Sequence, residues 1–248
     1  MVFKCMSLNL KSNMPLSSNF RLQGKVAIIT GGTSGIGATA AKLFHENGAK
    51  VVIADVQDKR GQALADKLGE GVCYVHCDVS NEDDIINLVD TAVAKYGKLD
   101  IMYNNAGNLD CPSGNILDTQ KSDVERLLAV NTVGGFLGAK HAARVMLPQR
   151  KGCILFTASD CRELAGVGSS AYAVSRYGVL GLVKGLEAEL GQYGIRVNCV
   201  STMRQMGNRR GQVLKTQDSI ANAALHLASD ETSYVSGQNL VSMEGSVF

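Results

Sequence analysis

The sequence carries almost no excess of charge of either sign. Its 25 lysines and arginines stand against 23 acidic residues, which leaves a formal net charge of +2 at pH 7. Proteins that bind nucleic acid or an anionic membrane surface usually concentrate basic residues in a patch or stripe, and this balance gives no sign of one. We therefore predict small-molecule ligands, with no nucleic acid and no membrane as partners.

Long apolar runs are missing as well. No segment approaches the roughly 18 consecutive apolar residues that suggest a membrane-spanning helix. The chain has only three prolines, and it shows no linker, internal repeat or low-complexity stretch. A length of 248 residues suits one large α/β domain with an ample core. We predict a single cytoplasmic domain over residues 21–248.

The first 20 residues differ in composition from the rest of the chain. They include Lys4 and Lys11, several serines and asparagines, and no acidic residue. This composition fits either a disordered tail or a weak organellar transit segment, which would direct the protein to the plastid. We favour a flexible tail over residues 1–20, and the plastid is the alternative location.

Cysteine pairs that would indicate disulfides or a zinc site are also absent. The seven cysteines are odd in number and show no Cys-x-x-Cys spacing, which predicts buried free thiols in a reducing compartment. His76 lies between Cys73 and Cys77, but a single histidine in such a place is more often packed than bound to a metal. We predict no metal site.

The sequence does contain a regular alternation of short apolar runs and helix-prone segments. The predicted strands are 25–30, 51–55, 72–76, 99–104, 153–157, 195–201 and 239–241, and the predicted helices are 38–46, 59–68, 83–96, 123–146, 170–192 and 219–228. Such alternation implies a parallel sheet that is covered on both faces. We predict a single-domain α/β fold, a Rossmann-like doubly wound parallel sheet flanked by helices on both faces.

A glycine-rich turn joins the first strand to the first helix. Gly31, Gly35 and Gly37 are spaced to let the backbone turn sharply, approach a pyrophosphate and pack the helix close to the sheet. Asp55 ends the next strand, eighteen residues after Gly37, where a carboxylate can bind ribose hydroxyls and repel a 2′-phosphate. The two residues that follow Asp55, of which the second is Gln57, carry no positive charge that could bind a 2′-phosphate. This pattern therefore favours NAD over NADP. The alternative is a flexible turn with an unrelated aspartate.

More polar residues follow the next two strands. Asp78 comes after the third strand, and the run Asn104–Gly107 comes after the fourth. Both fall at the carboxyl edge of the predicted sheet, where open sheets of this kind bind their ligands. Taken singly, these residues would be read as turn formers.

Tyr172 and Arg176 stand four residues apart in a predicted helix and therefore share one face. A free tyrosine has a pKa of about 10, and a nearby cation can lower it by favouring the phenolate. Such a pair also arises by chance, but Ser159, thirteen residues upstream at the end of a predicted strand, supplies a second hydroxyl. Asn131 lies in the middle of another predicted helix, and its amide could hold a water beside the pair if it faces the cleft.

These motifs together resemble the short-chain dehydrogenase/reductase family over roughly residues 20 to 245. The family's Thr-Gly-x-x-x-Gly-x-Gly stands as Thr30–Gly37, its Asn-Asn-Ala-Gly as Asn104–Gly107, and its helix Asn, Ser and Tyr as Asn131, Ser159 and Tyr172. The phrasing is most similar to plant members that act on terpenoid or other secondary alcohols. Borneol, isopiperitenol and secoisolariciresinol dehydrogenases and the nepetalactol-related enzymes are examples.

The resemblance implies NAD as cofactor and a homodimer or homotetramer. It implies that Tyr172 is the general acid/base, that Ser159 polarises the substrate oxygen and that Asn131 holds a proton-relay water. The cofactor-binding residues that it implies, together with the residues discussed above, are Gly31, Thr33, Ser34, Gly35, Ile36, Gly37, Asp55, Val56, Asp78, Val79, Asn105, Ala106, Gly107, Tyr172 and Arg176.

The chain also departs from the family pattern. Arg176 stands where a lysine normally binds the nicotinamide ribose, and Thr202 stands where a proline is usual. The connection after Thr202 is some two dozen residues shorter than in the family, and residues 242–245 replace Asp-Gly-Gly. We predict an NAD-dependent oxidoreductase that interconverts a terpenoid-like secondary alcohol and its ketone with reduced activity. The alternatives are a weak NAD-binding paralogue and a non-redox cyclase or isomerase that retains NAD.

Overall fold

The computed structural model describes residues 20–108, 115–159, 169–202 and 210–242, with the backbone alone at 202, 210–216 and 242. Most of the predicted tail, most of the shortened connection and the segment 243–245 lie outside these ranges. The predicted location and domain bounds therefore stay predictions. No helix in the described ranges is long and apolar enough to cross a membrane.

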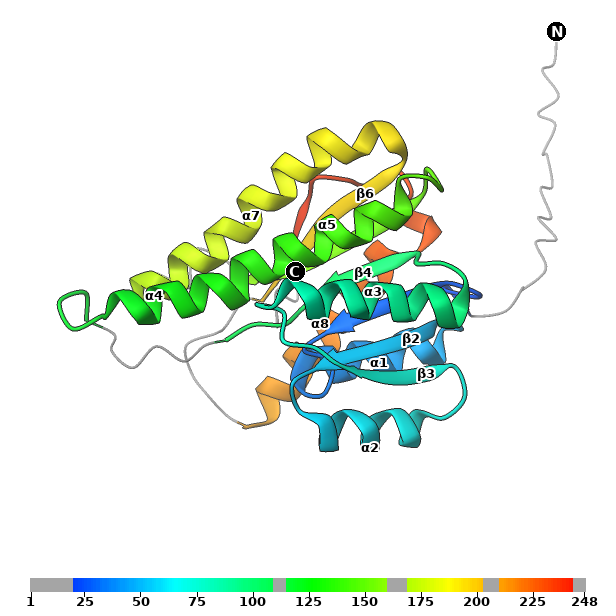
Figure 1. Cartoon of the computed structure of the whole chain (residues 1–248), viewed down its shortest axis with the longest axis horizontal. Coiled ribbons are helices and arrows are strands. Elements are labelled where there is room, and N and C mark those ends of the chain that lie inside the picture. The colour runs from blue at the N-terminus through cyan, green and yellow to red at the C-terminus, as the bar shows by residue number, and fades with distance from the viewer. Residues whose placement is uncertain (1–19, 109–114, 160–168, 203–209, 243–248) are drawn as a thin grey trace, which may run out of the picture.

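Seven parallel strands form one sheet in the order β3-β2-β1-β4-β5-β6-β7 (Figure 1). The strands are β1 (Val26–Thr30), β2 (Lys50–Asp55), β3 (Val72–His76), β4 (Ile101–Asn104), β5 (Gly152–Ser159), β6 (Ile195–Thr202) and β7 (Asn239–Ser242). Every residue of β1, β4 and β5 is buried, since helices cover both faces. This explains why these strands are continuous apolar runs without alternation.

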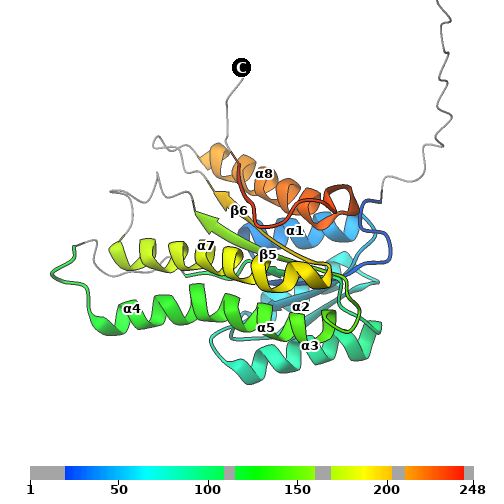
Figure 2. The same ribbon diagram turned by 90° about the horizontal axis from the view of Figure 1, so that it is seen from above.

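Helices lie on both faces of the sheet (Figure 2). Helices α1 (Gly35–Glu46), α2 (Asp58–Leu68) and α8 (Arg210–Ala228) cover one face, and α3 (Glu82–Tyr96), α5 (Gly134–Met146) and α7 (Ser170–Leu190) cover the other. Helix α4 (Lys121–Leu128) runs on into α5 and packs against α7. The predicted doubly wound sheet is confirmed.

Several predicted helices differ from the observed ones. The segment 123–146 contains a π-helical turn, η1 (Ala129–Val133), between α4 and α5. Helix α8 begins at Arg210, nine residues before the predicted start at 219. The sequence did not predict these first turns because they show no clear apolar period. Helix α7 ends at Leu190 and is followed by a 3-10 turn, η2 (Gly191–Tyr193). Helix α1 begins at Gly35, three residues before the predicted start at 38, and the other predicted elements lie within two residues of the observed bounds.

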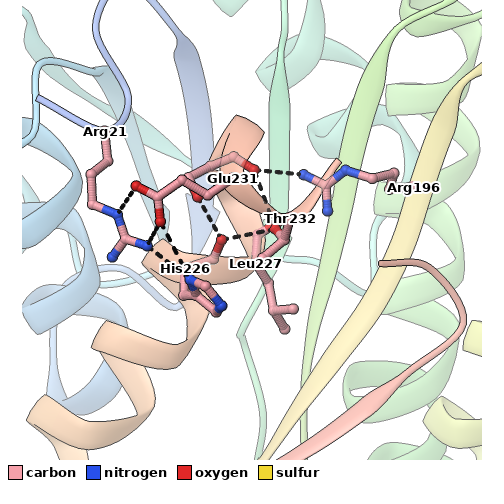
Figure 3. A network of polar contacts seen from close by, with 7 residues as sticks. Arg21, Arg196, His226, Leu227, Glu231 and Thr232 are labelled. Carbon is pink, nitrogen blue, oxygen red and sulfur yellow. Dashed lines mark hydrogen bonds and ion pairs between the residues drawn. The ribbon is translucent and has the colours of Figure 1, made fainter. Parts of the chain in front are cut away.

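Polar contacts tie the segment before β1 to the end of α8, at the amino edge of the sheet (Figure 3). Arg21 Nε donates to Glu231 Oε1 at 3.0 Å, and Arg21 Nη2 lies 2.8 Å from His226 Nδ1. Lys25 Nζ donates to Asp230 Oδ1 at 2.8 Å. The short helix η3 (Asp230–Thr232), which carries both acids, thus anchors the start of the domain.

The Lys25–Asp230 pair predicts a pH-dependent part of the stability. Lys25 holds the pKa of Asp230 below its usual value, so the pair stabilises the fold above the pKa of the unfolded carboxyl and loses its effect as pH falls through the lower folded value. We expect Asp230→Asn to lower the free energy of unfolding by about 0.5 kcal/mol at pH 7. Urea titrations should find no difference at the acid end, where both states are protonated. An equal loss across the whole range would contradict this account.

Candidate active site and cofactor cleft

The carboxyl ends of five neighbouring strands, β3, β2, β1, β4 and β5, open onto a cleft of about 600 Å³. Its lining contains most of the residues predicted to bind a cofactor, together with Ser159: Gly31, Ser34, Gly35, Ile36, Asp55, Val56, Asp78, Val79, Asn105, Ala106, Gly107, Ser159, Tyr172 and Arg176. Thr33 and Gly37 are not part of the lining. The lining also includes residues that were not predicted: Gln57, Cys77, Asn108, Val130, Thr157 and Ala158.

Close packing at the glycine-rich turn explains its composition. Gly31 has φ +62°, and a Cβ there would lie 2.8 Å from the Cα of Ala106. A Cβ on Gly37 would lie 2.1 Å from the carbonyl oxygen of Gly31. The turn therefore needs glycine for both backbone conformation and space, as the spacing predicted.

The amino end of α1 is suited to an anion. Ser34 is the N-cap residue but makes no side-chain capping bond, and the first turn carries no acidic residue. The first N–H groups of a helix have no partner within the helix, and they carry the positive end of its dipole. Ser34, Gly35 and Ile36 all line the cleft. This end of the cleft therefore fits the pyrophosphate of a dinucleotide.

A network around Thr30 fixes the loop after β4. Thr30 Oγ1 accepts from the backbone N–H groups of Asn105 and Ala106, each at 3.1 Å. The Asn105 amide donates to the carbonyls of Thr30 and Gly31 and accepts from Thr157 Oγ1 at 2.9 Å. The ends of β1, β4 and β5 are thereby held in one arrangement.

Asp78 is held at the edge of β3. Its Oδ1 accepts from the backbone N–H of Ser80 at 2.9 Å and from the Ser80 hydroxyl at 2.7 Å. These are the bonds of a turn, and they leave the side chain at the cleft wall beside Val79.

Ser159, Tyr172 and Arg176 meet at the base of the cleft. Ser159 Oγ lies 3.1 Å from the Tyr172 hydroxyl, and Arg176 Nε donates to the same hydroxyl at 3.2 Å. Each of the three residues is at most 8% exposed. Arg176 Nη1 donates to the carbonyl of Thr157 at 3.2 Å, and Nη2 lies so close to Gly107 that a Cβ there would be 2.1 Å away.

The local sequence explains this meeting. Ser169 is the N-cap of α7, and its hydroxyl accepts from the Tyr172 backbone N–H at 3.1 Å. Tyr172 therefore lies in the first turn of α7. Arg176 follows it by four residues in the same helix, so the two share one face as predicted. Strand β5 ends at Ser159 and delivers the second hydroxyl.

Asn131 lies in the π-helical turn and is 3% exposed. Its Oδ1 accepts from the Asn108 backbone N–H at 2.7 Å, and its Nδ2 donates to the Asn108 carbonyl and to Ser175 Oγ, each at 2.9 Å. The Asn131 amide is thus bonded to the backbone of Asn108, which lines the cleft. The water that we expected it to hold stays a prediction.

The described thiols are free and at least half-buried. Burial raises the pKa of Cys77 and of Cys199 to about 12, so neither is a ready thiolate. His76 Nδ1 lies 2.7 Å from Asp58 Oδ1, and this contact raises the histidine pKa. Across the described ranges, no group of three histidine, cysteine or acidic side chains could hold a metal ion.

The fold and the site together define a class of protein, a doubly wound α/β protein with a dinucleotide-type cleft and a Ser–Tyr pair at its base. A family model described as short chain dehydrogenase matches residues 25–206. The chain belongs to this family of oxidoreductases, whose members typically use a nicotinamide cofactor. The resemblance stated from the motifs is confirmed.

Several plant proteins are similar over most of their length. The (21S)-21-acetoxyl-apo-melianone synthase of Melia azedarach is 71% identical, in an alignment that covers 89% of each chain. Tropinone reductase-like 1 of Erythroxylum coca is 59% identical and also covers 89% of each chain. (+)-Borneol dehydrogenase 1 of Salvia officinalis is 54% identical, over 89% of this chain and 93% of its own.

A solved structure confirms the fold. A short-chain type dehydrogenase/reductase from Mycobacterium marinum superimposes with a TM-score of 0.81 at 30% identity, over 90% of this chain and 95% of that chain.

The Asn131 contacts predict a specific loss of order at the cleft wall. Asn131→Ala leaves the Asn108 N–H and carbonyl without these partners, so we expect a loss of about 1–3 kcal/mol of stability. Hydrogen exchange should speed up at residues 105–108. The control is Thr132→Val, which removes the neighbouring bond to the Ser175 carbonyl. Equal exchange of residues 105–108 in the two variants would contradict a role of Asn131 in positioning them.

Proposed function

We propose that the protein is an NAD-dependent oxidoreductase that interconverts a terpenoid-like secondary alcohol and its ketone. The contact of Ser159 and Arg176 with one tyrosine hydroxyl, at the base of a dinucleotide-type cleft, carries this proposal. The name of the Salvia relative, a borneol dehydrogenase, supports the substrate class. The name of the Melia relative, an apo-melianone synthase, is compatible with an alcohol–ketone pair.

In this proposal, different parts of the cleft bind different parts of the cofactor. The amino end of α1 holds the pyrophosphate, and the Asp55 carboxylate accepts from ribose hydroxyls and repels a 2′-phosphate, which favours NAD. A bound nicotinamide supplies the donor or acceptor of the hydride at the carbinol carbon. The loop 105–107 and the base of the cleft orient the substrate against it.

Tyr172 and Ser159 handle the substrate oxygen. In the oxidation direction, Tyr172 takes the hydroxyl proton of the alcohol as the carbon loses its hydride, and in reduction it returns the proton. Ser159, 3.1 Å from the tyrosine hydroxyl, donates a hydrogen bond to the substrate oxygen. Arg176 Nε can only donate, so its bond to Tyr172 strengthens when the tyrosine is a phenolate. Asn131 acts through the Asn108 backbone as a positioning residue.

Arg176 also favours a second candidate, a weak or inactive NAD-binding paralogue. The guanidinium is committed to Tyr172 on one side and to the Thr157 carbonyl on the other, and it packs on Gly107. A lysine ammonium has three rotatable donors, whereas the planar guanidinium has a fixed fork. The donors of Arg176 are therefore less free to turn toward ribose hydroxyls than those of a lysine would be. Errors of about 1 Å in the position of a reacting group can cost about a hundredfold in rate.

Replacing Arg176 tests the two candidates directly. We expect Arg176→Lys to raise kcat on a secondary terpenoid alcohol at least about tenfold, equal to about 1.4 kcal/mol of barrier, because the ammonium can serve the tyrosine and a ribose together. The dissociation constant for NAD should change less. The measurement is the absorbance of reduced nicotinamide with a panel of monoterpenols.

The control for this gain is Tyr172→Phe in the Arg176→Lys background. It removes the proton-transferring hydroxyl, so the added rate should disappear while NAD still binds. If Arg176→Lys brings no gain on any alcohol that binds, the paralogue becomes the better account.

Exposed apolar side chains on η1, α5 and α7 lead us to propose a homodimer or homotetramer. Val133, Phe136, Val174 and Tyr177 are each 44–56% exposed. Adjacent helices that leave such side chains in water usually bury them against a partner. Helices α4 and α5 follow one another along one line, and α7 lies beside them in both views (Figures 1 and 2).

Light scattering should give twice or four times the 26.3 kDa chain mass. Phe136→Glu should shift the mass toward the monomer, because a charge would be buried in the contact. Leu117→Glu is the matched control, since Leu117 is 87% exposed but precedes α4. A wild-type monomer at micromolar concentration would contradict the proposed homodimer or homotetramer.

A further inference from the structure

Another cavity lies at the amino edge of the sheet, opposite the cleft. It has a volume of about 110 Å³, below the roughly 300–1,000 Å³ of pockets for drug-sized ligands. The amino ends of β1, β4, β5 and β6 and the segment around η3 form it. The polar side chains of its lining include Lys25, Asp100, Lys151, Arg196, Asp230 and Ser233. The size suits one small ligand.

Both acids of this cavity already have cationic partners. Asp230 Oδ1 accepts from Lys25 Nζ at 2.8 Å. Asp100 Oδ2 lies 2.8 Å from the Nζ of Lys98, which is not part of the lining. Each carboxylate is therefore neutralised by its own lysine, and the remaining positive charge of the cavity is not compensated by an acid.

Lys151 and Arg196 supply this uncompensated charge. Neither forms an ion pair with an acid in the described ranges of the chain. Arg196 Nη2 donates to the Ser229 carbonyl at 3.2 Å (Figure 3), and Nη1 donates to the Val235 carbonyl at 3.4 Å. These two bonds orient the guanidinium, but they do not use all of its N–H donors. The ammonium of Lys151 is exposed at the start of β5.

A tight turn brings Lys151 and Arg196 to the same cavity. Gly194 has φ +73°, and a Cβ there would lie 2.5 Å from the carbonyl oxygen of Arg150. The segments that precede β5 and β6 therefore pack directly against each other, and the first residues of the two strands pair in the sheet. The fold thus fixes the spacing of these two cations.

The three cations of the cavity act on one point. Lys25 holds the pKa of the Asp230 carboxyl below its usual value through its hydrogen bond, and the charges of Lys151 and Arg196 act in the same direction. The cations come from three segments that are far apart in the sequence. Their positive charge is therefore concentrated at this cavity by the tertiary structure.

We propose that this cavity binds a free small oxyanion such as inorganic phosphate. Lys151 and Arg196 supply the charge that the two acids leave uncompensated, and the Ser233 hydroxyl in the lining supplies a neutral donor. Charge-assisted hydrogen bonds from several donors are the interactions that bind such an anion most strongly. The ion joins the starts of β5 and β6 to η3. Because the cavity lies on the other edge of the sheet from the cleft, this inference does not depend on the proposed function.

Removing the exposed lysine tests the site. We expect Lys151→Gln to weaken the binding of inorganic phosphate at least about fivefold, because a positive charge beside the anion is lost. Calorimetry measures this affinity, with sodium chloride keeping the ionic strength constant. Lys151→Arg keeps the charge and should bind phosphate within about threefold of the wild type. No phosphate binding by the wild type would overturn the inference while the proposed function stands.

Lys67→Gln is the matched control, since Lys67 is also an exposed lysine. It lies in the last turn of α2, which packs against the edge strand β3. Salt screens a charge that is far from the cavity, so the affinity for phosphate should stay within about twofold of the wild type. Equal weakening in the two glutamine variants would show only a general charge effect and would overturn the inference.

Hydrogen exchange locates the ion, because under the proposed function the amino end of α1 also binds phosphate. Phosphate should slow the exchange of residues 228–233 at least about twofold in the wild type and not in Lys151→Gln. Slowing that is confined to the glycine-rich turn would assign the ion to the cleft and would overturn the cavity as its site.

Two further measurements identify the competing group and the form of the ligand. Asp230→Asn removes a carboxylate from the cavity wall and should tighten phosphate binding at least about threefold. Unchanged or weaker binding would contradict the proposed site. Phenyl phosphate should bind at least about threefold more weakly than inorganic phosphate, because a cavity of this size leaves little room for the ring. Equal affinities would overturn the assignment of a free ion.

Discussion

The hydrogen bonds around Thr30 hold together the strand ends on which the cleft depends. One hydroxyl oxygen accepts from two successive N–H groups after β4, and the Asn105 amide connects β1 to Thr157 on β5. A parallel sheet carries its functional residues just beyond the carboxyl ends of the strands. A shift of one strand end would therefore move the glycine-rich turn relative to the Ser–Tyr pair.

Arg176 shows how one side chain can suit the fold and still change the chemistry. Its two bonds and its contact with Gly107 satisfy a buried charge, which would otherwise be costly. Those same bonds fix the guanidinium to the protein. Arg176 thus directs hydrogen-bonding capacity to the Thr157 carbonyl on β5. Under the proposed function, we expect this to affect turnover more than folding.

Two ends of the cleft present hydrogen-bond donors in different states. The amino end of α1 keeps its N–H groups free, because Ser34 does not cap it and no acid lies in its first turn. At the other end, the donors of Thr33 and Gln57 are already satisfied by Asp55. Under the proposed function, the first end binds an anion and the second repels one, although both present donors.

The sequence by itself determined the sheet, its helices and most of the cleft, because apolar period, glycine spacing and the helix repeat are local properties. It placed Asp55, Ser159, Tyr172 and Arg176 correctly, since strand ends and an i,i+4 pair follow from short-range geometry. Only the tertiary structure decided that Asn131 bonds to the Asn108 backbone and that Thr33 bonds to the Asp55 carboxylate. Both contacts join segments that are far apart in the sequence. Packing sets how these segments lie relative to one another, and no local sequence pattern encodes that.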